Sequence, residues 1–163
     1  MKQYLWFISV LISLTVFICI IVKKIDFVQN CGGYLKRAAD ANTIELAIDN
    51  LNFAIDYIEK NNLTHGYTSV LWKTPDEDLG FWYQNIKECH KELSKISPDA
   101  SVMDKTNVLM KLRESLTDDS KNGVTITVPN GISRYPHNLM WGVLLYVSIF
   151  LCIYCFIINN KNY

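Results

Sequence analysis

The chain has 163 residues, enough for about one domain, and half of them are hydrophobic. Sixteen Lys and Arg residues balance sixteen Asp and Glu residues, so the formal net charge is zero. These averages exclude a disordered acidic chain, a collagen-like chain and a strongly basic nucleic-acid-binding protein. They do not exclude a membrane protein, because an average does not show where the charged residues lie.

Two long segments of the chain carry no charge. All sixteen acidic residues lie between Asp26 and Asp119, and residues 4–22 and 139–158 contain no Lys, Arg, Asp or Glu. A bilayer core of about 30 Å is crossed by roughly 20 helical residues. Both segments have about this length and are rich in Ile, Leu, Val and Phe. We therefore predict two transmembrane helices, 4–22 and 139–158, with a short tail at 159–163.

The first apolar segment could alternatively be a cleaved signal peptide, since Lys2 precedes it. It is longer than the apolar part of a typical signal peptide, and Lys23-Lys24 follows it without a small-residue cleavage site. An uncleaved anchor is the favoured interpretation. With two spans, both short tails lie on one side of the membrane and the region 23–138 lies on the other.

Basic residues near the ends of the spans predict which side the region 23–138 occupies. Five of them lie on its side, against Lys2 and Lys161 on the side of the tails. This count favours a domain that faces the cytoplasm of a cell membrane. Cys31 and Cys89 would then be reduced thiols, whereas the opposite topology would allow them to form a disulfide.

The middle region is predicted to fold as a small helical bundle. Three helices are predicted, at about 34–61, 75–97 and 101–117, and in the first two the apolar residues recur at alternating intervals of three and four. Gly32-Gly33 is expected to form a joint between the first span and the first of these helices. The membrane-proximal extensions of the spans are expected to complete a four-helix packing.

Capping residues predict where these helices begin. Asn42 with Glu45 could form a capping box at a local start within the first helix, or that helix could run on from Lys36 without a break. Thr74 is predicted to cap the second helix. Ser101 is predicted to cap the third helix.

Two short segments are predicted to be strands. Residues 124–128 are alternately Val or Ile and Thr, all of them β-branched, and 67–72 is the other β-rich run of this region. Since a single strand needs a partner, we expect the two segments to pair as a short two-stranded β-ribbon. The predicted fold class is mainly α, with two transmembrane helices flanking a small helical-bundle domain that carries this ribbon.

Candidates for catalytic or metal-binding residues are few. Asp76 and Asp78 could form an acidic site, although acidic residues at this position also suit a helix N-terminus. His90 lies within a predicted helix and His65 in a loop, and no HExxH motif accompanies either of them. Nucleotide-binding glycine motifs and a nucleophile-elbow motif are also missing from the sequence. We predict no catalytic, cofactor-binding or metal-binding residue and no nucleic-acid partner.

Small residues recur on both predicted spans. Ser9 and Ser13 lie one turn apart on the first, and Gly142, Ser148 and Cys152 lie on the second. Small side chains allow membrane helices to approach closely, so these five residues are the candidate span interface. Neither span contains an Asp, Glu, Lys, Arg or His residue that would mark a transport path.

The connection 63–73 is unusually apolar for a loop, and aromatic residues follow it at 81–83. The loop could fold over the helical core. It could instead form a surface that binds a partner, because aromatic residues are enriched at interfaces. The candidate partner surface comprises His65, Tyr67, Val70, Leu71, Trp72, Phe81 and Tyr83.

The leading functional hypothesis is a membrane-anchored scaffold, accessory subunit or protein-interaction module without catalytic activity. Its partners would be the lipid bilayer and either another protein or a second copy of the chain. One alternative is a ligand-sensing domain without an output domain of its own. Another is a membrane enzyme or metal protein that uses His65, His90, or Asp76 and Asp78. The layout of two spans around a helical domain is similar to that of bacterial chemoreceptor and histidine-kinase sensor modules, in architecture and without a shared motif.

Overall fold

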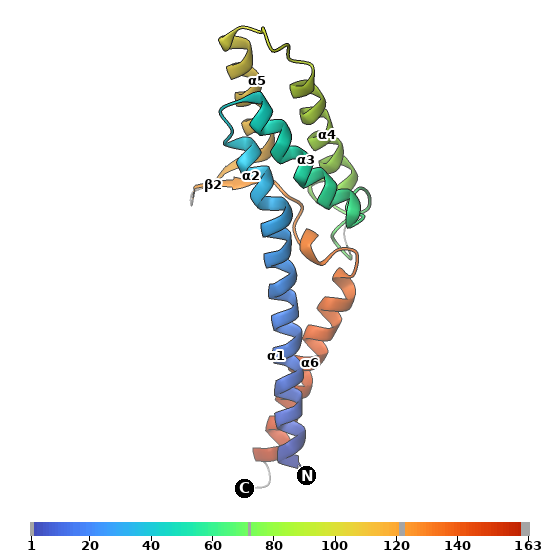
Figure 1. The fold of residues 1–163 in the computed structure, drawn as a ribbon. Helices are drawn as coiled ribbons and strands as arrows, with labels where there is room; N and C mark the ends of the chain where they lie inside the picture. Colours follow the sequence, from blue (N-terminus) through green and yellow to red (C-terminus); the bar gives the residue numbers. More distant parts are fainter. Residues whose placement is uncertain (1, 72, 121–122, 161–163) are drawn as a thin grey trace. The chain divides into compact units, whose positions relative to one another are not determined.

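The computed structural model describes residues 2–71, 73–120 and 123–160, and these residues are mainly helical. The chain divides into two compact units. One unit consists of Met1–Ile25 and Ser133–Tyr163, and the other of Asp26–Ile132. The first unit contains two long helices, and the second contains a helical domain with a small two-stranded sheet (Figure 1).

The two long helices are α1 (Lys2–Phe27) and α6 (Asn138–Asn160). Each contains an apolar stretch that is long enough to cross a membrane, as the sequence predicted. Only 6% of each stretch is buried, whereas the core helix of a soluble protein is mostly buried. Most apolar side chains of α1 and α6 therefore face outward.

Helix α1 runs on into the second unit without a break. A π-helical turn, η1 (Val28–Gly32), joins it to α2 (Gly33–Ala39). The joint expected at Gly32-Gly33 is absent, because both glycines have helical backbone angles. Gly33 instead permits the wide turn: its N–H donates to the carbonyl of Val28, five residues earlier, and a Cβ at this position would lie 3.0 Å from that oxygen.

The predicted helix over 34–61 is interrupted after α2, and α3 spans Ile44–Lys60. Thr43 caps α3, since its side-chain oxygen accepts a hydrogen bond from the Leu46 amide (3.2 Å). A local start was one of the two alternatives, but the capping residue is Thr43 and not Asn42. The reason is local geometry: Thr43 has the extended backbone that directs a side-chain oxygen to the amide three residues later.

Helix α4 (Leu79–Ser94) begins later than the predicted helix over 75–97. Pro75–Glu77 form a separate 3-10 turn, and Asp78 caps α4 by accepting hydrogen bonds from two amides of its first turn (2.8 and 3.2 Å). The prediction of Thr74 as the cap of this helix was therefore wrong. Asp78 has the extended backbone of a capping residue, and its carboxylate also suits the positive end of the helix dipole.

Helix α5 (Val102–Leu116) follows the prediction closely. The Ser101 hydroxyl accepts a hydrogen bond from the Asp104 amide (3.1 Å) and donates one to the Asp104 carboxylate (2.7 Å), so Ser101 is the cap. Leu112 and Leu116 are buried, but Met103 is 73% exposed, so only the C-terminal half of the helix reaches the core.

The core of the second unit lies among α2, α3, α4 and α5. Helix α2 packs against α3 and α5, and α4 packs against the same two helices, which makes a four-helix arrangement (Figure 1). The fourth helix arises because the predicted helix over 34–61 is divided into α2 and α3, and α2 follows α1 through η1. Buried apolar side chains come from all four: Leu35, Ala38, Ala47, Leu51, Ala54, Ile58, Leu79, Trp82, Ile86, Leu93, Leu112 and Leu116.

The sheet is a hairpin of β1 (Thr117–Ser120) and β2 (Gly123–Ile126), paired antiparallel. The strand predicted at 124–128 is thus largely present, but its predicted pairing with 67–72 was wrong. Its partner is the segment immediately before it, and joining adjacent segments closes a much shorter loop than a pairing with 67–72 would. In the predicted partner segment, Tyr67 forms only an isolated bridge with Asp78.

Candidate functional site

The apolar loop between α3 and α4 is held firmly against the start of α4. The Thr68 amide donates to the Glu77 carbonyl (3.1 Å), and the Leu79 amide donates to the Gly66 carbonyl (2.9 Å). Leu63 and Thr68 are buried, so this end of the loop folds over the core, as the first alternative proposed. His65, Tyr67, Val70, Leu71 and Lys73 of the same loop are exposed.

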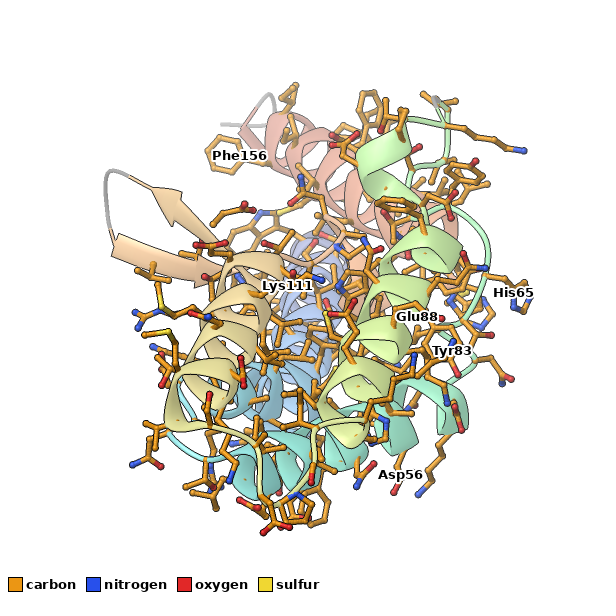
Figure 2. The ribbon with its side chains drawn as sticks, turned by 90° about the horizontal axis from the view of Figure 1, so that it is seen from above. Asp56, His65, Tyr83, Glu88, Lys111 and Phe156 are labelled. Carbon is orange, nitrogen blue, oxygen red and sulfur yellow. The ribbon has the colours of Figure 1, made fainter. Side chains whose placement is uncertain are left out.

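Part of the candidate partner surface is exposed on this loop and on the first turn of α4. The exposed fractions are 48% for Val70, 78% for Leu71 and 62% for Phe81, and Tyr67 is exposed to 36%. His65 is exposed, and Figure 2 shows its side chain directed away from the domain. Trp72, the remaining loop residue of the prediction, lies outside the described residues.

Tyr83 belongs to a different environment from the other members of the predicted surface. Its hydroxyl donates to the Glu59 carboxylate, which also receives Lys87 at 3.3 Å, so these three side chains join α3 to α4. Hydrogen bonds from Tyr83 and Lys87 lower the pKa of Glu59, and the bond to Glu59 raises the pKa of Lys87. Tyr83 was predicted to be part of the partner surface, and its hydrogen bond to Glu59 within the domain was not predicted.

The residues of the enzyme or metal alternative do not come together. Asp78 is engaged as the cap of α4, Asp76 is exposed beside it, and His65 is exposed on the loop. His90 is half-buried, and its Nε2 atom has no hydrogen-bond partner among the described residues. Within the described ranges, no three His, Cys, Asp or Glu side chains are grouped so that they could hold a metal ion.

A cavity of about 390 Å³ lies between the start of α4, the end of α5 and the segment that follows β2. The indole N–H of Trp82 donates to the Thr127 carbonyl (3.0 Å), and the Thr127 amide donates to the Leu116 carbonyl (2.9 Å). These two bonds fix the segment after β2 against both helices and so form one wall of the cavity. Sequence reasoning missed this site, because the two residues of the indole bond are 45 positions apart.

The thiol of Cys89 also lines this cavity, next to Ser115 of α5. Burial raises the pKa of the Cys89 thiol, and its interaction with Ser115 offsets the rise in part. Cys31 is fully buried, and all five cysteines of the chain are free thiols. The disulfide between Cys31 and Cys89 that the opposite topology would allow is therefore not formed in this structure.

A polar cluster that the sequence did not suggest lies where α1 leads into η1. The Tyr57 hydroxyl of α3 donates to the Asp26 carboxylate (2.7 Å), and the Asn30 side-chain amide donates to its other oxygen (2.8 Å). Burial raises the pKa of Tyr57, and the hydrogen bond and charge of Asp26 raise it further. This cluster ties α3 to the helix that continues from the first apolar segment.

Two of the five candidate span-interface residues are buried within the unit that α1 and α6 share. Ser9 is 6% exposed and Ser148 is 4% exposed, while Ser13, Gly142 and Cys152 are half-buried. The hydroxyl of Ser9 donates to the Trp6 carbonyl and that of Ser148 to the Leu145 carbonyl, so both are satisfied within their own helix. The pairing of the spans through these residues stays a prediction.

Comparison with known proteins adds no further constraint. No protein family, no curated protein and no solved structure matches this chain.

Proposed function

We propose that the chain is an integral membrane protein whose two spans, 4–22 and 139–158, anchor a helical interaction domain. The observation that carries this proposal is the exposure of the two apolar helices, which are only 6% buried over their apolar stretches. Exposed apolar surface in water costs roughly 25 cal/mol per Å². A helix that shows apolar side chains on most of its circumference is stable when lipid surrounds it.

The residues next to the apolar segments support this placement. Lys23 and Lys24 are exposed at the end of the first segment, where their ammonium groups would reach the lipid headgroups. Ser9 and Ser148 are buried and small, so they would let the two spans pack closely in the membrane. The hydrophobic effect does not drive helices together in lipid, and association there depends on such close packing.

The domain offers a protein partner a surface that is already formed. Val70, Leu71 and Phe81 expose apolar side chains, and backbone hydrogen bonds of Thr68 and Leu79 attach the loop to the helix start next to them. Little conformational entropy is lost when such a surface binds, so the apolar area can contribute to affinity. The partner that fits is a protein with a complementary apolar patch, either another membrane-associated protein or a second copy of this chain.

Site-specific photo-crosslinking in the native membrane tests this proposal. A photoreactive amino acid at Leu71 is expected to capture one defined partner, and the yield should drop when Phe81 is changed to Asp. The same probe at Asp56, an exposed residue of α3, is the control and should capture little. Capture that is equal at Leu71 and Asp56, or unaffected by Phe81→Asp, would contradict an interaction surface at this loop.

Membrane insertion is tested separately. After extraction of membranes with alkaline carbonate, the full chain should stay in the pellet, because two apolar spans hold it in the bilayer. Recovery in the supernatant would show that the two helices do not insert.

A second candidate, ligand sensing, is favoured by one observation. The cavity between α4, α5 and the segment after β2 has a volume of about 390 Å³, which lies within the range of roughly 300–1,000 Å³ that is usual for small-molecule sites.

A further inference from the structure

The walls of this cavity are fixed before any ligand arrives. Asp78 holds the first turn of α4 through two backbone amides, and Trp82 and Leu116 hold Thr127 through hydrogen bonds of 3.0 and 2.9 Å. Each wall is therefore attached to a helix of the domain core. A preformed site loses little free energy on ordering when a ligand binds.

The apolar part of the lining suits the body of an organic molecule. Phe81 and Trp82 contribute aromatic rings, and Ile86, Leu116 and Ile126 contribute aliphatic side chains. Phe81 is 62% exposed, so much of its ring surface remains open to a bound molecule. Aromatic faces attract cations through their quadrupole, in addition to the apolar contact that they offer.

The charged part of the lining has a single sign. Asp76, Asp78 and Asp118 line the cavity, and none of the other lining residues in the described part of the chain is Lys, Arg or His. Carboxylates around a partly enclosed space make its potential negative, which attracts cations and repels phosphates and carboxylates. The three carboxylates do not form a group that could hold a metal ion, so their charge is spread around the cavity.

We propose that this cavity binds a small organic cation, an ammonium group carried on an apolar body. The apolar body would lie against the aromatic and aliphatic wall, and the negative potential that Asp76, Asp78 and Asp118 create together would attract the ammonium group. This proposal names the ligand class of the ligand-sensing candidate and rests on that candidate alone. It does not depend on the membrane spans, and it shares only Phe81 with the surface around Leu71.

The test uses the full chain in nanodiscs of zwitterionic phosphatidylcholine, with binding measured by isothermal titration calorimetry. The probe is 2-phenylethylammonium, and its matched controls are neutral 2-phenylethanol and anionic phenylacetate. The ammonium compound is expected to bind at least about tenfold more tightly than the alcohol, since it adds the attraction of the carboxylates to the same apolar contact. Phenylacetate is expected not to bind.

Two variants at the cavity and one control outside it test whether the ligand binds there. The double variant Asp76→Asn with Asp118→Asn should weaken binding of the ammonium compound about tenfold, because two exposed carboxylates of the site are lost. Asp49→Asn with Asp56→Asn removes the same charge from exposed positions on α3, outside the cavity, and should change nothing. Phe81→Leu should weaken binding of the ammonium compound by a few-fold, and this variant tests the same site without changing a charge.

Three results would overturn the proposal. They are no binding of the ammonium compound, equal affinity for the ammonium compound and the alcohol, or equal weakening of binding by the two pairs of Asp variants. Carbonate extraction of the same variants distinguishes failure of this proposal from failure of the membrane anchor. A variant that no longer binds the ligand but still inserts into the membrane stays in the pellet.

Discussion

Changing Tyr57 to Phe removes one hydroxyl group that joins α3 to the end of α1. In the structure this hydroxyl donates to the Asp26 carboxylate across 2.7 Å. A hydrogen bond to a charged group contributes roughly 1.5–3 kcal/mol to stability, and Asp26 is exposed while Tyr57 is half-buried, so we expect about 1 kcal/mol here. For a domain of this size, that loss lowers the melting temperature by roughly 4 °C.

Thermal unfolding of the full chain in a neutral detergent measures the effect. A double-mutant cycle with Asp26→Ala should give a coupling of about 1 kcal/mol, since the second change has no bond left to break. Tyr34→Phe is the control: the Tyr34 ring packs against Phe53, with 5.0 Å between ring centroids, and the change keeps this contact. It should shift the melting temperature by no more than about 1 °C.

Wild type and Tyr57→Phe can also be compared as a function of pH. Burial and Asp26 raise the pKa of Tyr57 above its ordinary value of 10.0. A raised pKa in the folded state means that the stabilisation is complete below about pH 10 and is lost as the pH rises through the folded-state value. The stability difference between wild type and Tyr57→Phe should stay constant from about pH 6 to about pH 9 and shrink above about pH 10. No difference at neutral pH, or one that grows in alkali, would refute the reasoning.

Three further tests concern the stability of the domain. Leu51→Ala leaves a cavity at a fully buried position and should lower the free energy of unfolding in urea by about 3 kcal/mol. Leu71→Ala, at a side chain that is 78% exposed, should lower it by less than about 0.5 kcal/mol. Equal losses would contradict the assigned core. Thr43→Ala should remove about 1 kcal/mol through loss of the α3 cap, and Thr43→Ser should restore most of it. Lys111→Met breaks the exposed pair with Glu92 (2.8 Å) and should lower the melting temperature only at low salt, so an effect that persists in about 1 M salt would refute a screened ion pair.

Local patterns in the sequence predicted the helices well. The two uncharged segments lie in α1 and α6. Apolar residues that recur at helical spacing in the middle region, such as Leu51, Ile86 and Leu93, are buried. These features depend on neighbours within one or two helical turns, so the sequence displays them directly. Ser101 was predicted as a cap for the same reason.

Competition between nearby residues limited the predictions at helix starts. Asn42 and Thr43 both have side chains that can cap α3, and Thr74 and Asp78 can both cap a turn near α4. Backbone conformation decides between them, and the flanking loop sets that conformation. The sequence therefore located these starts only to within a few residues.

Contacts between distant residues explain most of what sequence reasoning missed. Asp26 and Tyr57 are 31 positions apart, and Trp82 and Thr127 are 45 apart, so no periodic pattern reveals either hydrogen bond. The candidate cavity depends on the second of them. The partner of the strand at 124–128 was missed because the polar segment Thr117–Ser120 has little β-propensity and pairs through its proximity in the chain.

In the proposed arrangement, two membrane spans place the helical domain on one side of the bilayer and the tails on the other. Cysteine accessibility tests it most directly. Cys31 is fully buried, so the probe cysteines are introduced at Asp56 on α3 and at Lys2 near the start of the chain, in a chain that lacks the native cysteines. With a membrane-impermeant maleimide, we predict labelling at position 2 in intact cells and at position 56 only after permeabilisation. Labelling of both positions from the same side would contradict the two-span arrangement.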